Sequence, residues 1–216
     1  MESSHHAAPP AFTKHPWHGV SIGTQAPEIC TVFIEIVPTD TVKYEVDKDS
    51  GLLKVDRPQQ FSNVVPALYG FFPQTLCDVA VGNFCAQQTG RPHIIGDQDP
   101  LDVCVLTEKI IARSGILVRA IPIGGFRMID GNEADDKIIA VLQGDEVYDE
   151  WRDITDANEA VIKRLKHYFL TYKKGPDEVG NRVEIAAVYG KDEAYEVIRK
   201  SQFDYQQRFL QQSMLP

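Results

Sequence analysis

The stretch 30-CTVFIEIVPTDTVKYEVDKDSGLLKVD-56 decides the fold. It holds three short segments rich in β-branched residues, at 30–37, 41–46 and 51–56, and the last two are joined by the turn 47-DKDSG-51. Short runs that alternate apolar and polar side chains are typical of half-buried strands. The stretch therefore predicts a strand followed by a β-hairpin.

More strands are expected downstream. Residues 71–96 contain Gly and Pro with little periodicity, which predicts a long loop of the kind that is often functional. Gly124 and Gly125 indicate a bend or bulge between two strands. Apolar runs bounded by Gly, Pro or Asp clusters predict strands at about 101–107, 116–121, 126–129 and 137–142.

Helical periodicity appears late in the chain. Within 156–174, apolar and aromatic residues recur at intervals of three and four, and Asp156 followed by Glu159 resembles a capping box. A strand at 182–188 and a second helix at about 191–209 follow. The predicted class is mainly β with α (α+β), an OB-like closed β-barrel with helices packed outside.

Length and composition favour one domain. The 216 residues are 43% hydrophobic and 25% charged, close to globular averages. We expect a flexible N-terminal arm at 1–27 and a single domain at 28–216. No apolar run could span a bilayer, and the first residues lack the basic and apolar regions of a secretory signal, so a cytoplasmic location is expected. The four cysteines lack C-x-x-C spacing and are expected to be reduced structural thiols.

The formal net charge of −9 limits the partners. Such a charge repels nucleic-acid phosphates and anionic membranes, so neither is expected to bind. An anionic substrate would need metal ions or clustered Lys and Arg.

The segment 96-GDQDPLDVCVL-106 places Asp97, Asp99 and Asp102 at the mouth of a predicted strand. One D-x-D alone is most often an acidic turn, but a third aspartate weakens that interpretation because like charges this close repel without a cation. An EF-hand is excluded, since its sixth position requires Gly and here holds Asp102. Oxygen ligands without nearby Cys or His favour magnesium or manganese over zinc, and the expected cofactor is magnesium with manganese as a substitute.

A second acidic group lies at 130-DGNEADDK-137. Alone it is most often a solvated loop, but together with the first group it could complete a site for more than one metal. Glu35 interrupts an apolar strand, where a carboxylate needs a cation or hydrogen-bond partner. In the hairpin, a salt-bridged surface is the simplest interpretation of three residues that share one face, namely Lys43, Glu45 and Asp47.

These segments resemble, in order from about Val32 to Tyr189, the family I soluble inorganic pyrophosphatases of the bacterial type. The strongest element is D-Q-D-P-L-D-V at 97–103, which fits that family's D-x-D-P-x-D-V. The resemblance implies a magnesium-dependent enzyme that hydrolyses inorganic pyrophosphate to two phosphates, assembled as a homohexamer. Five further blocks carry it: 33-FIEI-36, 42-VKYEVDKDSGLLKVDR-57, 68-LYG-70, 130-DGNEADDK-137 and 171-TYKK-174.

The resemblance also implies a role for each matched residue. Asp99 would accept the proton of the attacking water. The metal ligands would be Asp97, Asp102 and Asp135, with Asp130 and Glu35 serving a further metal. The phosphates would be bound by Lys43, Arg57, Lys137, Tyr172 and Lys173, with Tyr69 lining the site and Glu45 and Asp47 close by.

Two features depart from the family pattern. Val65 stands where the family commonly has a tyrosine, so an altered rate or metal affinity is expected. The segment 71–96 is longer than in compact bacterial members. Two other functions stay open from the residues alone: a non-catalytic binding module on a small β-barrel, and a metal-dependent phosphomonoesterase or nuclease using the same carboxylates.

Overall fold

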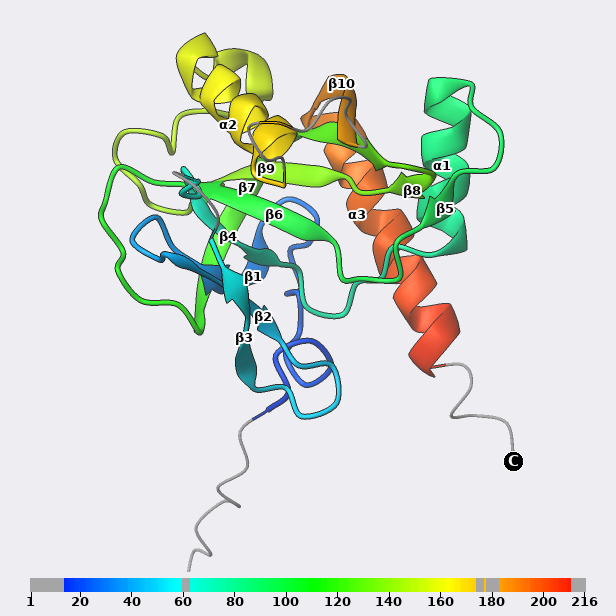
Figure 1. Ribbon diagram of the computed structural model, residues 1–216, viewed down its shortest axis with the longest axis horizontal. Helices are drawn as coiled ribbons and strands as arrows, with labels where there is room; N and C mark the ends of the chain where they lie inside the picture. The colour runs from blue at the N-terminus through cyan, green and yellow to red at the C-terminus, as the bar shows by residue number, and fades with distance from the viewer. Residues whose placement is uncertain (1–13, 60–62, 174–176, 178–182, 211–216) are drawn as a thin grey trace, which may run out of the picture.

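The computed structural model describes residues 14–59, 63–173, 177 and 183–210 (Figure 1). Five strands form a closed ring. They pair in the order β1 (Cys30–Ile36), β4 (Leu68–Phe71), β6 (Asp102–Leu106), β9 (Lys137–Leu142) and β7 (Ile116–Asp130), and β7 pairs in turn with β1.

The remaining elements surround this ring. Strand β10 (Val183–Gly190) pairs with β7, β8 (Glu133–Ala134) pairs with β7 and β5 (Ile95–Gly96), and β2 (Val42–Val46) with β3 (Leu53–Pro58) forms a separate hairpin. Helices α1 (Val79–Thr89) and α3 (Lys191–Tyr205) pack together on one side, and α2 (Glu159–Thr171) lies near β10 (Figure 1). This arrangement confirms the predicted α+β fold with helices outside a closed ring of strands.

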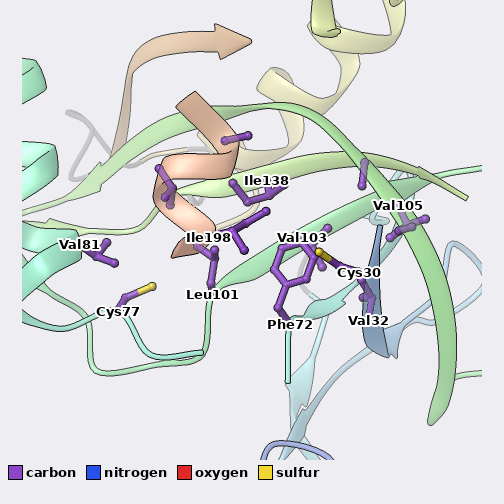
Figure 2. Packing of buried hydrophobic residues seen from close by; sticks show 14 of the residues in the cluster. Cys30, Val32, Phe72, Cys77, Val81, Leu101, Val103, Val105, Ile138 and Ile198 are labelled. Atoms are coloured by element: carbon purple, nitrogen blue, oxygen red, sulfur yellow. The ribbon is translucent and has the colours of Figure 1, made fainter. Parts of the chain in front are cut away.

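Strands β6 and β9 form the centre of the core. They run parallel and are buried on both faces. Val103 and Val105 point into an apolar cluster shared with α1 and α3 (Figure 2), whereas the intervening Cys104 points into a second cluster shared with α2. Strands buried on both faces read as continuous apolar runs, which explains why both were visible in the sequence.

The two strands predicted at 116–121 and 126–129 are one strand. Its residues 116–120 pair with β1, 120–126 with β9 and 124–130 with β10. The register shifts between Pro122 and Gly124, which confirms the predicted bulge. The bulge bends β7 without ending it, so one long strand contributes both to the ring and to the edge outside it.

The long loop expected at 71–96 is wrong in part, because it contains α1 and β5. The Asp78 side chain at the start of α1 makes no capping hydrogen bond. Instead, the Asp204 carboxylate of α3 accepts hydrogen bonds from the backbone N–H groups of Asp78, Ala80 and Val81 at 2.9–3.0 Å. The cap therefore comes from a distant part of the chain, where local sequence patterns cannot reveal it.

The two late helices differ from their predicted bounds. Helix α2 begins after Asn158, whose side chain accepts a hydrogen bond from Ala160 N at 2.9 Å, while Asp156 belongs to the preceding 3-10 turn (Ile154–Asp156). Helix α3 ends at Tyr205 and continues as a π-helical turn (Gln206–Leu210). Among the described residues, no helix is both long and apolar enough to cross a bilayer.

The expected N-terminal arm also needs correction for residues 14–27. Trp17 is only 5% exposed, and its Nε1 donates a hydrogen bond to the carbonyl of Thr75 at 2.7 Å. Ile22 is buried in the cluster that contains α1 and α3. Burial of these apolar side chains holds the segment against the body, while residues 1–13 lie outside the described part of the chain.

Candidate active site

A cleft of about 230 Å³ opens between the β2–β3 hairpin and the loop that precedes β6. Residues far apart in the sequence meet in it. Most of the predicted site residues line it: Glu35, Lys43, Glu45, Arg57, Tyr69, Asp97, Asp99, Asp102, Asp135, Lys137, Tyr172 and Lys173.

The parallel pairing of β6 with β9 forms the floor of the cleft. It sets Asp102 beside Lys137, and the Lys137 ammonium contacts the carboxylates of both Asp102 and Asp135. Burial alone would lower the pKa of Lys137, but these two carboxylates hold the pKa well above its ordinary value. A buried cation is thus retained by the negative charge around it.

The carboxylates themselves are crowded. Burial, followed by the charge of Asp135, raises the pKa of Asp97 well above its ordinary value. Burial also raises the pKa of Asp135, although the ammonium of Lys137 opposes it. The charged forms of these carboxylates are therefore disfavoured, chiefly by burial, even with the ammonium of Lys137 beside them.

The donor set fits a hard divalent cation. The Lys137 ammonium already lies between two of the carboxylates as a stand-in cation, and carboxylate oxygens are the ligands that magnesium and manganese prefer. Within the described ranges, no group of three His, Cys, Asp or Glu side chains is gathered into a ready cage.

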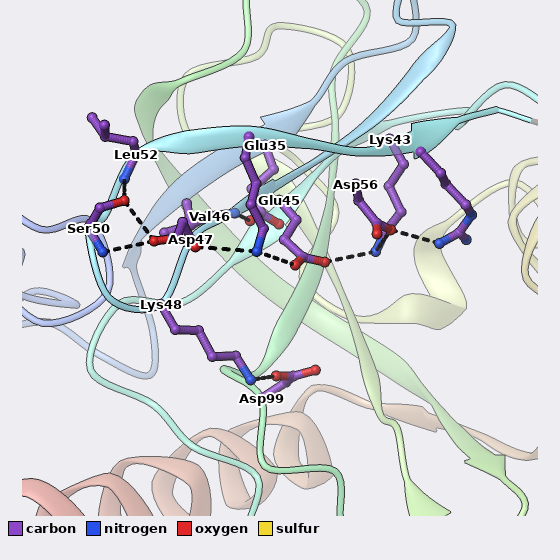
Figure 3. Close-up of polar contacts among 12 residues, drawn as sticks. Glu35, Lys43, Glu45, Val46, Asp47, Lys48, Ser50, Leu52, Asp56 and Asp99 are labelled. Atoms are coloured by element: carbon purple, nitrogen blue, oxygen red, sulfur yellow. Dashed lines mark hydrogen bonds and ion pairs between the residues drawn. The ribbon is translucent and has the colours of Figure 1, made fainter.

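Asp99 lies on a pinned loop at the edge of the cleft. Its backbone N–H donates to Asp97 Oδ1 at 3.0 Å, and its carbonyl accepts from Cys77 N at 2.8 Å. The Asp99 side chain is 53% exposed and is contacted by the ammonium of Lys48, which reaches across from the hairpin turn (Figure 3). The loop holds this carboxylate in place while leaving it open to solvent.

Glu35 is the buried acid on β1. It accepts a hydrogen bond from Val46 N at 2.7 Å, on the neighbouring hairpin strand. Burial raises the pKa of Glu35 to about 8, although this hydrogen bond opposes the shift. The sequence analysis expected a cation or a hydrogen-bond partner for this buried carboxyl group. The structure provides a hydrogen bond from one backbone N–H group, that of Val46.

Cations and hydroxyls line the opposite wall. Lys43 Nζ lies 2.8 Å from Asp56 and 3.3 Å from Glu45, and Arg57 Nη1 lies 2.7 Å from the same Asp56 carboxylate (Figure 3). Burial would lower the pKa of Lys43, but its bond to Asp56 gives a net rise. The wall thus brings the ammonium of Lys43 and the guanidinium of Arg57 to the cleft, each paired with a carboxylate of the same hairpin.

Two predicted residues stand outside the cleft lining. Asp130 lies behind Lys173, whose Nζ is 2.9 Å from Asp130 Oδ2. Asp47 is engaged in its own turn, where it accepts hydrogen bonds from Ser50 N and Ser50 Oγ at 3.0 and 2.8 Å. Val65 is fully buried in the cluster shared with α2 and is also absent from the lining.

Several residues that line the cleft were not predicted as site residues, among them Lys48 and Trp17. Lys48 Nζ lies 6.0 Å from the centre of the Trp17 ring, and the Lys48 carbonyl is 3.1 Å from His15 Nε2. In the sequence, Lys48 belongs to the predicted hairpin turn, and Trp17 belongs to the predicted N-terminal arm. The resemblance to the family assigns no role to Lys48 or Trp17. Only the folded structure places these two residues at the cleft.

Comparison with known proteins gives one consistent family. The family model for inorganic pyrophosphatase matches residues 32–206. The inorganic pyrophosphatase of Chlamydia muridarum is 49% identical over 205 residues, covering 93% of this chain and 98% of the relative, and that of Chlamydia caviae is 49% identical over 199 residues, covering 90% and 92%. The crystal structure of inorganic pyrophosphatase from Thermus thermophilus matches with a TM-score of 0.74 and 29% identity, covering 90% of this chain and 99% of that chain. The chain therefore belongs to the inorganic pyrophosphatase family, enzymes that hydrolyse pyrophosphate with the help of divalent metal ions.

Proposed function

We propose that this cleft hydrolyses inorganic pyrophosphate to two orthophosphates with magnesium as the working metal. One observation carries the proposal: a single small cavity joins the aspartate floor to a wall of Lys, Arg and Tyr. Pyrophosphate is small and highly anionic, so its binding depends on cations and metals rather than on apolar contacts. A cleft of about 230 Å³ with both sets of groups suits such a substrate.

The metal ligands follow from the position of the carboxylates. Asp97, Asp102 and Asp135 would hold the activating magnesium, and Asp130 and Glu35 would serve a further ion, with manganese as a substitute. When bound, these ions would neutralise charge on the substrate and make a water molecule easier to deprotonate. Burial, and then neighbouring carboxylates, disfavour the charged forms of Asp97 and Asp135, which supports this assignment because a bound cation would favour those charged forms.

The chain's own groups would position the substrate and accept a proton. Asp99, open to solvent on its pinned loop, would take the proton of the attacking water. The phosphates would be bound by Lys43, Arg57, Lys137, Tyr172 and Lys173, with Tyr69 lining the floor. Because several of these cations already pair with carboxylates, phosphate oxygens would replace those partners when the substrate binds.

The first test is phosphate release by the purified chain. With magnesium present, inorganic pyrophosphate should be cleaved, and a chelator should abolish the release. ATP and a phosphomonoester, supplied as rival substrates, should release little phosphate because the cleft is small and most of its lining residues are charged, which suits a compact anion better than an organic group. Equal release from a phosphomonoester, or no release from pyrophosphate with metal present, would contradict the proposal.

Asp99→Asn tests the proton acceptor. The variant should lose about 100-fold or more in kcat because the amide cannot accept the proton of water. Circular dichroism and the melting temperature should stay close to those of the parent, since the side chain is exposed. Asp49→Asn, the same change at an exposed position in the hairpin turn, serves as the matched control and should keep parental kcat. Near-parental kcat in a folded Asp99→Asn protein would remove this role.

Glu35 gives a pH-dependent prediction for the protein in chelator. Its folded pKa of about 8 exceeds its ordinary 4.5, so the stability contributed by the neutral acid is complete below pH 4.5 and is lost as the pH rises to about 8. Glu35→Gln cannot ionise. Calorimetry should therefore find the melting temperature of the variant rising relative to the parent between pH 4.5 and 8. A constant difference across that window would show that Glu35 does not change ionisation there.

We also propose a cytoplasmic location, and a homohexamer as the resemblance to bacterial members implies. Light scattering on the purified protein should give a mass about six times the 24.2 kDa of one chain. A mass near 24.2 kDa at micromolar concentration would rule the assembly out.

A further inference from the structure

A buried ion pair lies directly behind the carboxylate floor. Arg127 of β7 is 1% exposed and Asp136 is 2% exposed, and Arg127 Nε lies 3.4 Å from Asp136 Oδ1. The register explains why they meet. The same antiparallel alignment runs from the Ile129–Ala134 pair of β7 and β8 to the Phe126–Lys137 pair of β7 and β9, so Arg127 stands opposite Asp136.

Further groups from β10 and the helices hold this pair. The hydroxyl of Tyr189 donates a hydrogen bond to Asp136 Oδ1 at 2.7 Å, and Arg127 Nη1 donates to Glu193 of α3 at 2.7 Å. The guanidinium lies 5.0 Å from the ring centres of both Phe84 and Tyr189. Asp136 is therefore held directly by Arg127 and Tyr189, and Arg127 is held in turn by residues of α1 and α3; none of these groups lines the cleft.

The Tyr189 ring has little freedom to move. It packs over Gly125 of β7, where an added Cβ would lie 2.5 Å from a ring carbon. The arrangement also carries a cost, because Arg127 Nε and Nη2 are both buried with no hydrogen-bond partner among the described residues, so the contact of Nε with Asp136 is an ion pair without a hydrogen bond. Buried ion pairs contribute little net stability, so stabilisation alone does not account for this one.

Asp136 separates two residues of the cleft. Asp135 N donates to Met128 O at 3.0 Å, which keeps this stretch extended along β7. In an extended chain, successive side chains point to opposite faces. When Asp136 is fixed on the face of Arg127, Asp135 and Lys137 are directed into the cleft on the other face.

We propose that Arg127, Asp136 and Tyr189 are positioning residues that aim the Asp135 carboxylate and the Lys137 ammonium at the metal and the phosphate. The inference rests on the proposed role of Asp135 as a magnesium ligand. Partners behind a metal ligand set its direction, and losing one typically costs about 10- to 100-fold in metal affinity or activity.

Tyr189→Phe is the principal test, because it removes one hydroxyl and leaves the ring in place. Magnesium binding is measured by isothermal titration calorimetry without substrate, and the magnesium concentration for half-maximal hydrolysis is measured separately. The dissociation constant for magnesium and the magnesium concentration for half-maximal hydrolysis should both rise about tenfold in the variant. Asp136→Asn should also raise both of these magnesium constants. The KM for pyrophosphate at saturating magnesium should change less.

Thr107→Val is the matched control. The Thr107 hydroxyl donates a hydrogen bond to the buried carboxylate of Asp145 at 2.6 Å, as Tyr189 does to Asp136, but neither Thr107 nor Asp145 lines the cleft. Both variants should lose some thermal stability, and only Tyr189→Phe should lose magnesium affinity.

Each failure has a distinct pattern. If the parent binds magnesium and Tyr189→Phe binds it equally well, with a loss of melting temperature like that of Thr107→Val, the three residues only stabilise the fold and the inference is wrong. If the parent itself binds no magnesium, the proposed function is wrong, and the inference, which depends on it, is wrong as well.

Discussion

The site depends on the parallel register of β6 and β9. Parallel strands start at the same edge of a sheet, so the loop before β6 and the loop before β9 emerge side by side. One loop carries Asp97 and Asp99, and the other carries Asp135, while Asp102 and Lys137 are the paired first residues of the two strands. A slip of one residue in this register would turn Lys137 away from Asp102 and break up the floor of the cleft.

That register brings several carboxylates close together, and nearby cations must offset their repulsion. The chain carries a net charge of −9, yet it buries Lys137 among carboxylates and extends Lys48 over Asp99. Even beside these lysines, burial and then neighbouring carboxylates raise the pKa of Asp97 and disfavour its charged form. A bound cation would favour the ionised carboxylates of such a site, which is why the proposed metal suits it.

Much of the fold was predictable because its signals are local. The apolar runs of β6 and β9 follow from burial on both faces, and α2 follows from its amphipathic pattern. Helix α1 was not predictable in the same way. Its buried face is narrow and includes Gly82, and the carboxylate that caps it belongs to Asp204 on α3. A cap supplied from elsewhere in the chain leaves no local trace.

The residues of the site also fall into a group that local sequence reveals and a group that only the folded structure reveals. The aspartate motif and the cations of the hairpin were recognisable as sequence blocks, whereas Lys48 and Trp17 joined the cleft only through tertiary contacts. Trp17 shows how such contacts reach the chemistry. Its indole donates to the Thr75 carbonyl, and the Thr75 hydroxyl accepts a hydrogen bond from Leu101 N at 3.0 Å, just beyond Asp99. The N-terminal segment is therefore joined by two hydrogen bonds, through Thr75, to the end of the loop that holds the proposed proton acceptor.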